Sequence, residues 1–247
     1  MQKKIFFTIF TSLISLLMAC SDVGKAPEPD LELVKNQGPE AAMTCQYIRH
    51  SMDGSHQSDT SWFLLRAPDR VESYDEMRKE SQIWQKDQNG LVSEMHVFHS
   101  EKLVLEVSNG DLLASGHLPK WATIWSMVDP EEIAKNYKST GHLKIKDMPV
   151  EVFQGEKEGI ETDLEWLSPL ALPVAMKMTS TKGVDALRLK GCWTPAQGPM
   201  QPTTQEQLLA YRHIDFSDLG DMESDPQVQR ITKLLGHGHA HEEEGHH

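Results

Sequence analysis

The chain has 247 residues, of which 24 are Lys or Arg, 37 are Asp or Glu and 12 are His, for a formal net charge of −13. This length predicts one domain, and 38% hydrophobic residues can form a core, which excludes a wholly disordered chain. The acidic balance disfavours a nucleic-acid partner, because nucleic-acid-binding proteins carry a basic surface.

The first twenty residues predict export and lipidation. Two lysines precede an apolar stretch from Ile5 to Ala19, which is too short to span a bilayer comfortably and is typical of a secretory signal. The stretch ends in Leu17-Met18-Ala19-Cys20 and resembles the lipobox of bacterial lipoproteins, in which the cysteine thiol receives a diacylglycerol. This resemblance implies a signal peptide over residues 1–19, a lipid anchor on Cys20 and, because Ser21 follows, the periplasmic side of the outer membrane. The alternative is an ordinary signal peptide with a chance cysteine.

The segment after the anchor is predicted to be a spacer. Residues 20–40 contain several acids and prolines 27, 29 and 39, a composition that favours a flexible tether. We therefore expect the folded body to occupy residues 41–235.

Cys45 and Cys192 are predicted to form a disulfide. Exported proteins fold in an oxidising compartment, where an even pair of cysteines is usually bonded. The alternative is two buried thiols. Neither cysteine lies in a C-x-x-C motif, so redox catalysis is not expected.

Short β-rich runs separated by turn signals predict a mainly β (α+β) fold with a single curved antiparallel sheet. The expected strands cover residues 61–66, 70–74, 81–86, 91–99, 102–107, 142–146, 150–154, 161–167, 174–179 and 186–193. Two helices are expected between the fifth and sixth strands.

The first of these helices covers residues 119–127, where apolar residues recur every three or four positions and predict one apolar stripe. The stripe consists of Trp121, Ile124, Trp125 and Val128. Asp129-Pro130-Glu131-Glu132 predicts the start of the second helix, because Asp is a favoured N-cap and Pro a favoured first residue.

The run from Trp62 to Glu72, with its apolar strand, basic residue, proline and second strand, resembles the opening hairpin of the outer-membrane lipoprotein-sorting proteins. The helix pair and the later segment from Glu165 to Pro173 fit the same family. The resemblance implies an incomplete barrel closed by a short helical lid over an apolar cavity that takes acyl chains. It also implies that Arg66 helps to close the lid, whose inner face carries Trp121, Ile124, Trp125 and Val128. The alternative is that the large aromatic residues only fill a core.

The C-terminal part predicts a helix and a histidine-rich tail. Asp225-Pro226 predicts a helix that ends near Leu235 at Gly236, and the preceding acids fit helix caps and solvent exposure better than a calcium loop. Residues 236–247 are expected to be disordered and to bind zinc, copper or nickel weakly through imidazole nitrogens, less so below about pH 6. The candidate metal ligands are His237, His239, His241, His246 and His247.

No nucleophile elbow, metalloprotease or phosphate-loop motif occurs in the chain, so the sequence predicts a non-enzymatic protein with no required cofactor. Two functional hypotheses remain. The first is a membrane-anchored monomer that binds an acyl chain or a lipoprotein, and the second is an envelope lipoprotein that handles metal through its tail.

Overall fold

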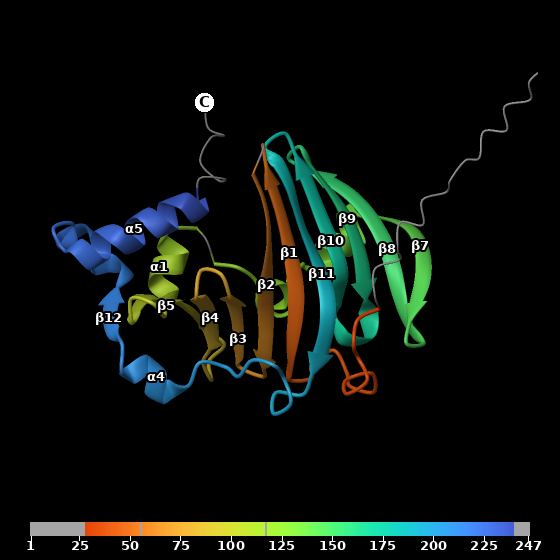
Figure 1. The fold of residues 1–247 in the computed structure, drawn as a ribbon, viewed down its shortest axis with the longest axis horizontal. Coiled ribbons are helices and arrows are strands. Elements are labelled where there is room, and N and C mark those ends of the chain that lie inside the picture. Colours follow the sequence, from red (N-terminus) through yellow and green to blue (C-terminus); the bar gives the residue numbers. More distant parts are fainter. Residues whose placement is uncertain (1–27, 55, 117, 240–247) are drawn as a thin grey trace, which may run out of the picture.

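The computed structural model describes residues 28–54, 56–116 and 118–239, so the predicted signal peptide and Cys20 lie outside the described residues. Twelve strands form one sheet in the order β12-β6-β5-β4-β3-β2-β1-β11-β10-β9-β8-β7 (Figure 1). The sheet does not close into a barrel, which confirms the predicted mainly β fold with one incomplete barrel.

Two antiparallel meanders make up this sheet, and helices connect them. The first meander comprises β1 (Met43–Asp53), β2 (His56–Ala67), β3 (Arg70–Asp75), β4 (Glu80–Lys86), β5 (Val92–Phe98) and β6 (Leu103–Val107). The connecting helices are α1 (Asn109–Ala114), α2 (Trp121–Ser126) and α3 (Pro130–Asn136). The second meander comprises β7 (Lys138–Ile145), β8 (Met148–Lys157), β9 (Ile160–Leu167), β10 (Leu172–Ser180) and β11 (Gly183–Trp193), with a 3-10 turn at Ser168–Leu170.

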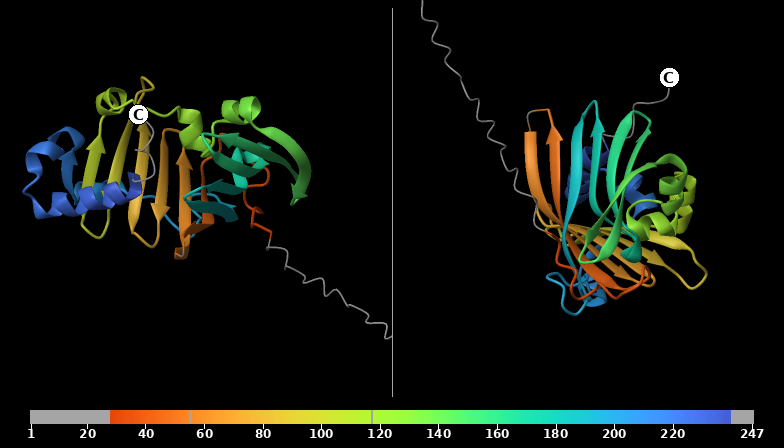
Figure 2. Two further views of the ribbon diagram at one scale, coloured as in Figure 1. Left: turned by 90° about the horizontal axis from the view of Figure 1, so that it is seen from above. Right: turned by 90° about the vertical axis from the view of Figure 1, so that its right-hand side faces the viewer.

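The sheet is strongly bent, and the two faces carry different elements. In the right-hand view of Figure 2 the strands of the second meander stand upright together with the hairpin ends of β1 and β2, the other strands of the first meander run at an angle to them, and α2 and α3 lie in that angle. The concave face carries Tyr47 and Leu64, together with Trp84, which lies opposite Val71. The other face carries Leu65 and Glu72 and is crossed by the segment 194–211, which includes α4 (Gln205–Leu209).

The folded body begins before residue 41, so the predicted spacer is too long. Asp30 donates its backbone N–H to the Lys190 carbonyl at 2.9 Å, and the Asp30 carbonyl accepts from the Cys192 N–H at 2.8 Å. Leu31 and Val34 are fully buried. Two apolar side chains three residues apart gain free energy by covering the sheet, and they remove this segment from solvent. We call residues 30–41 the N-terminal strap.

The C-terminal elements differ from the prediction in two ways. The short strand β12 (Arg212–Asp215) pairs parallel to β6, whereas every other strand pair is antiparallel in the part of the chain that the structure describes. The predicted helix after Asp225 is confirmed as α5 (Pro226–His239), but it continues past Gly236, the expected terminator. Residues 236–239 are therefore helical and do not belong to a disordered tail.

Candidate functional site

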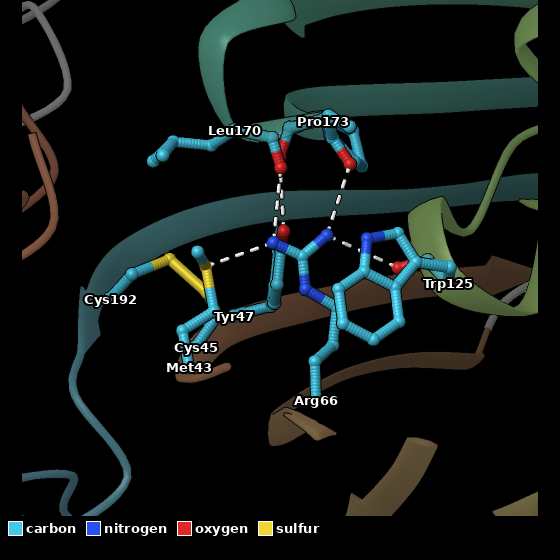
Figure 3. The surroundings of a disulfide bond; sticks show 9 residues. Met43, Cys45, Tyr47, Arg66, Trp125, Leu170, Pro173 and Cys192 are labelled. Carbon is cyan, nitrogen blue, oxygen red and sulfur yellow. Dashed lines mark hydrogen bonds between the residues drawn. A yellow bond between two sulfur atoms is a disulfide. The ribbon is translucent and has the colours of Figure 1, made fainter. Parts of the chain in front are cut away.

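Arg66 lies beneath the lid helix α2 and joins three parts of the chain (Figure 3). Its Nη1 donates to the carbonyl oxygens of Trp125 and Ala171, each at 3.3 Å. Its Nη2 donates to the Leu170 carbonyl at 3.0 Å and contacts the Met43 sulfur at 3.0 Å. One guanidinium thus holds α2, the turn before β10 and the start of β1 together.

The Arg66 charge is buried without a carboxylate partner. The residue is 2% exposed, and it forms no ion pair with any residue that the structure describes. Burial lowers the pKa of Arg66 to about 10, an effect that nearby Tyr47 and Glu40 partly offset. Carbonyl dipoles therefore take the place of a counter-ion, and one of the three, that of Trp125, is supplied by α2.

Trp125 is the residue of the lid helix α2 that covers Arg66. It is 5% exposed, its ring lies 4.6 Å from the Arg66 guanidinium carbon, and its Nε1 donates to the Pro39 carbonyl at 2.8 Å. This stacking of a cation on an indole adds attraction in a desolvated place. Arg66 therefore contacts α2 through both the ring and the backbone of Trp125, and its role in closing a lid stays a prediction.

The turn between α2 and α3 sets the angle of the lid. Met127 adopts a left-handed backbone conformation with φ of 66°, which ends α2, and the Asp129 side chain accepts from the Glu131 N–H and caps α3. Lys120 bridges the two helices through Asp129 at 3.0 Å and Glu131 at 2.7 Å. The predicted helix pair and its N-cap are confirmed.

The predicted lid residues belong to two apolar clusters. Trp121 and Ile124 are half-buried and pack on the same cluster as Trp125, and the Trp121 ring lies 4.6 Å from the Lys86 ammonium at the end of β4. Val128 is buried in a second cluster with Leu164. The stripe expected from helical periodicity therefore divides where α2 ends.

The space under α2 is occupied by side chains of the protein itself. Tyr47, Leu64, Val71 and Trp125 are all buried in one cluster on the concave face. Tyr47 is held there by a hydrogen bond from its hydroxyl to the Pro173 carbonyl at 3.1 Å, and burial raises the pKa of this tyrosine. A set of half-buried apolar side chains surrounds the cluster, namely Trp62, Trp84, Trp121, Ile124, Met127 and Leu187. The concave face is thus apolar, and the side chains of the protein fill the space where the sequence resemblance implied a cavity.

A small pocket lies on the other face, where the segment after β11 crosses the sheet. It has a volume of about 60 Å³, far below that of a typical ligand site. Thr44, Leu65, Arg70, Pro195 and Pro202 are among its lining residues. A cavity of this size cannot hold an acyl chain.

Sequence reasoning missed a buried polar network near this pocket. Glu72 is fully buried and accepts hydrogen bonds from the Thr203 N–H at 3.0 Å, from the Thr203 and Ser81 hydroxyls, and from Arg70 at 2.9 Å. His99 is linked to the Ser81 hydroxyl at 3.0 Å, and burial lowers the pKa of this histidine. No sequence signal joins Glu72 to Thr203, which follows it by 131 positions.

Cys45 and Cys192 form the predicted disulfide, with sulfur atoms 2.07 Å apart (Figure 3). They lie directly opposite each other on β1 and β11, the one place where the two meanders pair. The bond therefore joins the two halves of the sheet.

The predicted metal ligands of the tail stay a prediction, because none of their side chains is among the described ones. His237 and His239 lie in the last turn of α5, whereas His241, His246 and His247 lie outside the described part. Across residues 28–239, apart from 55 and 117, no group of three His, Cys, Asp or Glu side chains could hold a metal ion.

No described helix combines the length and apolar character needed to cross a membrane. No family model matches the sequence, and no curated protein matches it.

Several solved structures resemble the chain at low similarity. PNGF-II is 12% identical with a TM-score of 0.43, over 74% of this chain and 33% of PNGF-II, so the chain spans about a third of that protein. MucB of Pseudomonas aeruginosa, in complex with MucA, is 13% identical with a TM-score of 0.32, over 67% and 54% of the two chains. An outer membrane lipoprotein-sorting protein domain from Vibrio parahaemolyticus is 11% identical with a TM-score of 0.33, over 65% and 87%. Proteins of the predicted lipoprotein-sorting kind are therefore among the structures that resemble this chain, and likenesses this remote do not define an activity.

Proposed function

We propose that this chain is a lipid-anchored, monomeric envelope protein that binds an acyl chain of a lipid or lipoprotein on the concave face of its sheet. It resides in the periplasm, attached through Cys20 to the outer membrane, and it has no catalytic turnover. The observation that carries the proposal is the buried Arg66, whose Nη1 and Nη2 donate to carbonyl oxygens of the lid and of the turn before β10, while its Nε has no partner among the described residues.

Such a latch is suited to a lid that opens and recloses. The bonds from Arg66 to Trp125 and Ala171 are each 3.3 Å long, and the apolar surface beneath α2 becomes accessible when they break. An acyl chain gains about 0.8 kcal/mol for each methylene that it buries, which can offset the displacement of α2. The half-buried side chains of Trp62, Trp84 and Leu187, which border this surface, supply the first apolar contacts for the acyl chain.

A photoreactive fatty acid tests the proposal. The purified full chain is labelled with a diazirine-bearing palmitate, and the labelled peptides are identified by mass spectrometry. We expect saturable labelling in peptides that carry Trp62, Trp84, Trp121 or Leu187. Two more exposed apolar residues outside this cluster, Leu209 at 71% and Met77 at 63% exposure, serve as internal controls.

The proposal is contradicted if unlabelled palmitate does not compete with the labelling. It is also contradicted if Leu209 and Met77 are labelled as strongly as the lid. Replacement of Trp84 by Ala is expected to weaken competition by palmitate several-fold. The matched replacement Leu209→Ala is expected to leave it unchanged.

A further inference from the structure

We infer that the N-terminal strap is the second half of the lid latch, so that the segment next to the membrane anchor controls access to the concave face. This inference rests on the proposed function for the ligand and the anchor, and on the geometry of residues 30–41 for the latch itself.

The strap is fixed to the sheet at its first residue. Asp30 forms two backbone hydrogen bonds with β11, one on each side of Gly191. A Cβ atom at Gly191 would lie 2.8 Å from the Asp30 carbonyl oxygen, so glycine permits this close crossing. The crossing point adjoins Cys192 and therefore the disulfide between the meanders.

The middle of the strap belongs to the core that the lid covers. Leu31 and Val34 are both fully buried, in the same apolar cluster as Trp125. Leu33, between them, is 44% exposed. Burial of Leu31 and Val34 stabilises the docked position of the strap on the sheet. The exposed Leu33 is a control position, where the same substitution removes no buried contact.

The end of the strap reaches the lid directly. The Pro39 carbonyl accepts the hydrogen bond from Trp125 Nε1, while Arg66 donates to the Trp125 carbonyl. Trp125 is therefore held from two sides, by the strap through its indole and by β2 through its backbone. Opening α2 breaks both attachments, so the lid opens more often when the strap is released.

The strap lies close in sequence to the proposed lipid anchor on Cys20. Ten residues separate Cys20 from Asp30, and a fully extended chain of that length spans at most about 35 Å. The strap is thus the part of the folded body nearest to the proposed lipid anchor, and its docking changes when the body moves relative to the membrane. The N-terminal segment would then couple membrane attachment to ligand entry.

Hydrogen exchange of the full chain tests the latch without any ligand. The double variant Leu31→Ser/Val34→Ser undocks the strap, and Trp125→Phe removes the indole donor together with part of the buried ring that Arg66 contacts. We expect amides of α2, residues 121–126, to exchange about fivefold or more faster in both variants, as expected when one hydrogen bond and its buried contacts are lost. Leu33→Ser makes the same chemical change at an exposed position and should stay within about twofold of the wild type.

The inference is overturned if α2 exchange is unchanged in both variants while residues 30–40 exchange faster in the double variant. If exchange in β1 and β11 also rises in the double variant, exchange of residues 30–40 in Trp125→Phe decides the question, because loss of the indole donor frees the strap only if the strap and the lid are joined through Pro39. The association rate of palmitate is measured on the same variants. If α2 exchanges faster in the variants but no protein binds palmitate, the latch is supported and the proposed function is contradicted. If palmitate binds but α2 exchange is unchanged, the proposed function is supported and the latch is contradicted.

Discussion

The guanidinium of Arg66 lies over the indole ring of Trp125 and also donates a hydrogen bond to the carbonyl of the same residue. One side chain thus contacts both the ring and the backbone of the lid residue, so a buried cation contributes to the position of α2. The lid is consequently sensitive to changes at residue 66.

Replacement of Arg66 by Leu is expected to lower the free energy of unfolding by roughly 1–3 kcal/mol, because the carbonyls of Trp125, Leu170 and Ala171 lose their donor. Urea unfolding followed by tryptophan fluorescence measures the change. Arg78→Leu, at an exposed position, should change it by less than about 0.5 kcal/mol. Equal stability of the Arg66→Leu and wild-type proteins would show that the carbonyl contacts contribute nothing to the closed state.

Replacement of Glu72 by Gln is expected to cost roughly 2–4 kcal/mol, because Arg70 then loses its buried carboxylate partner and Thr203 one charged acceptor. The segment 203–211 should exchange its amides faster, since Glu72 fixes it to the sheet. Glu76→Gln, an exposed carboxylate in the following turn, is the control. Unaltered protection of residues 203–211 would argue against Glu72 as their attachment.

His99 is expected to lower the stability of the protein as the pH drops below 6.5, whereas the raised pKa of His213 acts in the opposite direction. Burial lowers the pKa of His99 in the folded state, although the nearby Glu72 charge partly opposes this. Between the folded and unfolded pKa values the unfolded chain binds more protons, so acidification favours unfolding. Urea midpoints at pH 7.5 and 5.5 should differ less in His99→Gln than in the wild type. The exposed replacement His142→Gln should keep the wild-type difference, and an identical difference in all three proteins would refute the role of His99.

Loss of the disulfide is expected to lower the free energy of unfolding by at most roughly 4–5 kcal/mol, because the bond closes a loop with a sequence separation of 147. The double variant Cys45→Ala/Cys192→Ala is compared with the wild type by urea unfolding. Dithiothreitol should shift the wild-type midpoint towards that of the variant and leave the variant unchanged. A wild-type midpoint that dithiothreitol does not move would indicate that the bond adds no stability.

Metal binding by the tail remains a prediction from its sequence. Calorimetric titration of zinc, copper and nickel into the full chain and into a chain truncated after residue 235 separates tail from body. We expect binding only in the full chain and a loss of affinity below about pH 6, where protons compete for imidazole nitrogens. Equal affinity of the two chains would exclude the tail as the binding segment.

Local patterns predicted much of this fold. Alternating apolar residues identified ten of the twelve strands, and the N-cap Asp129 located α3. The strand β1 was missed because Arg49, His50 and Ser51 obscure its second half, although Met43, Cys45 and Tyr47 already alternate on the buried face. The four residues of β12 carry too little pattern to predict a parallel pairing with β6.

The candidate site was predictable only in part. The helical apolar stripe singled out Trp125, because that signal is local, whereas Arg66 was singled out only by the resemblance of its hairpin to the lipoprotein-sorting proteins. The bond from Trp125 to Pro39 depends on where the strap crosses the sheet, and a sequence in which residues 20–40 look like a spacer gives no indication of it. Glu72 and Thr203 meet only through the path of the 194–211 segment, which no periodicity specifies.

The pairing of β1 with β11 determines when the protein can finish folding. The first long strand made during synthesis has to wait for one that emerges well over a hundred residues later, and such distant partners slow assembly. Until then β1 and its hairpin neighbour present an unsatisfied edge that invites mispairing with other nascent chains. Folding should therefore depend on chaperones and on thiol oxidation at this last step.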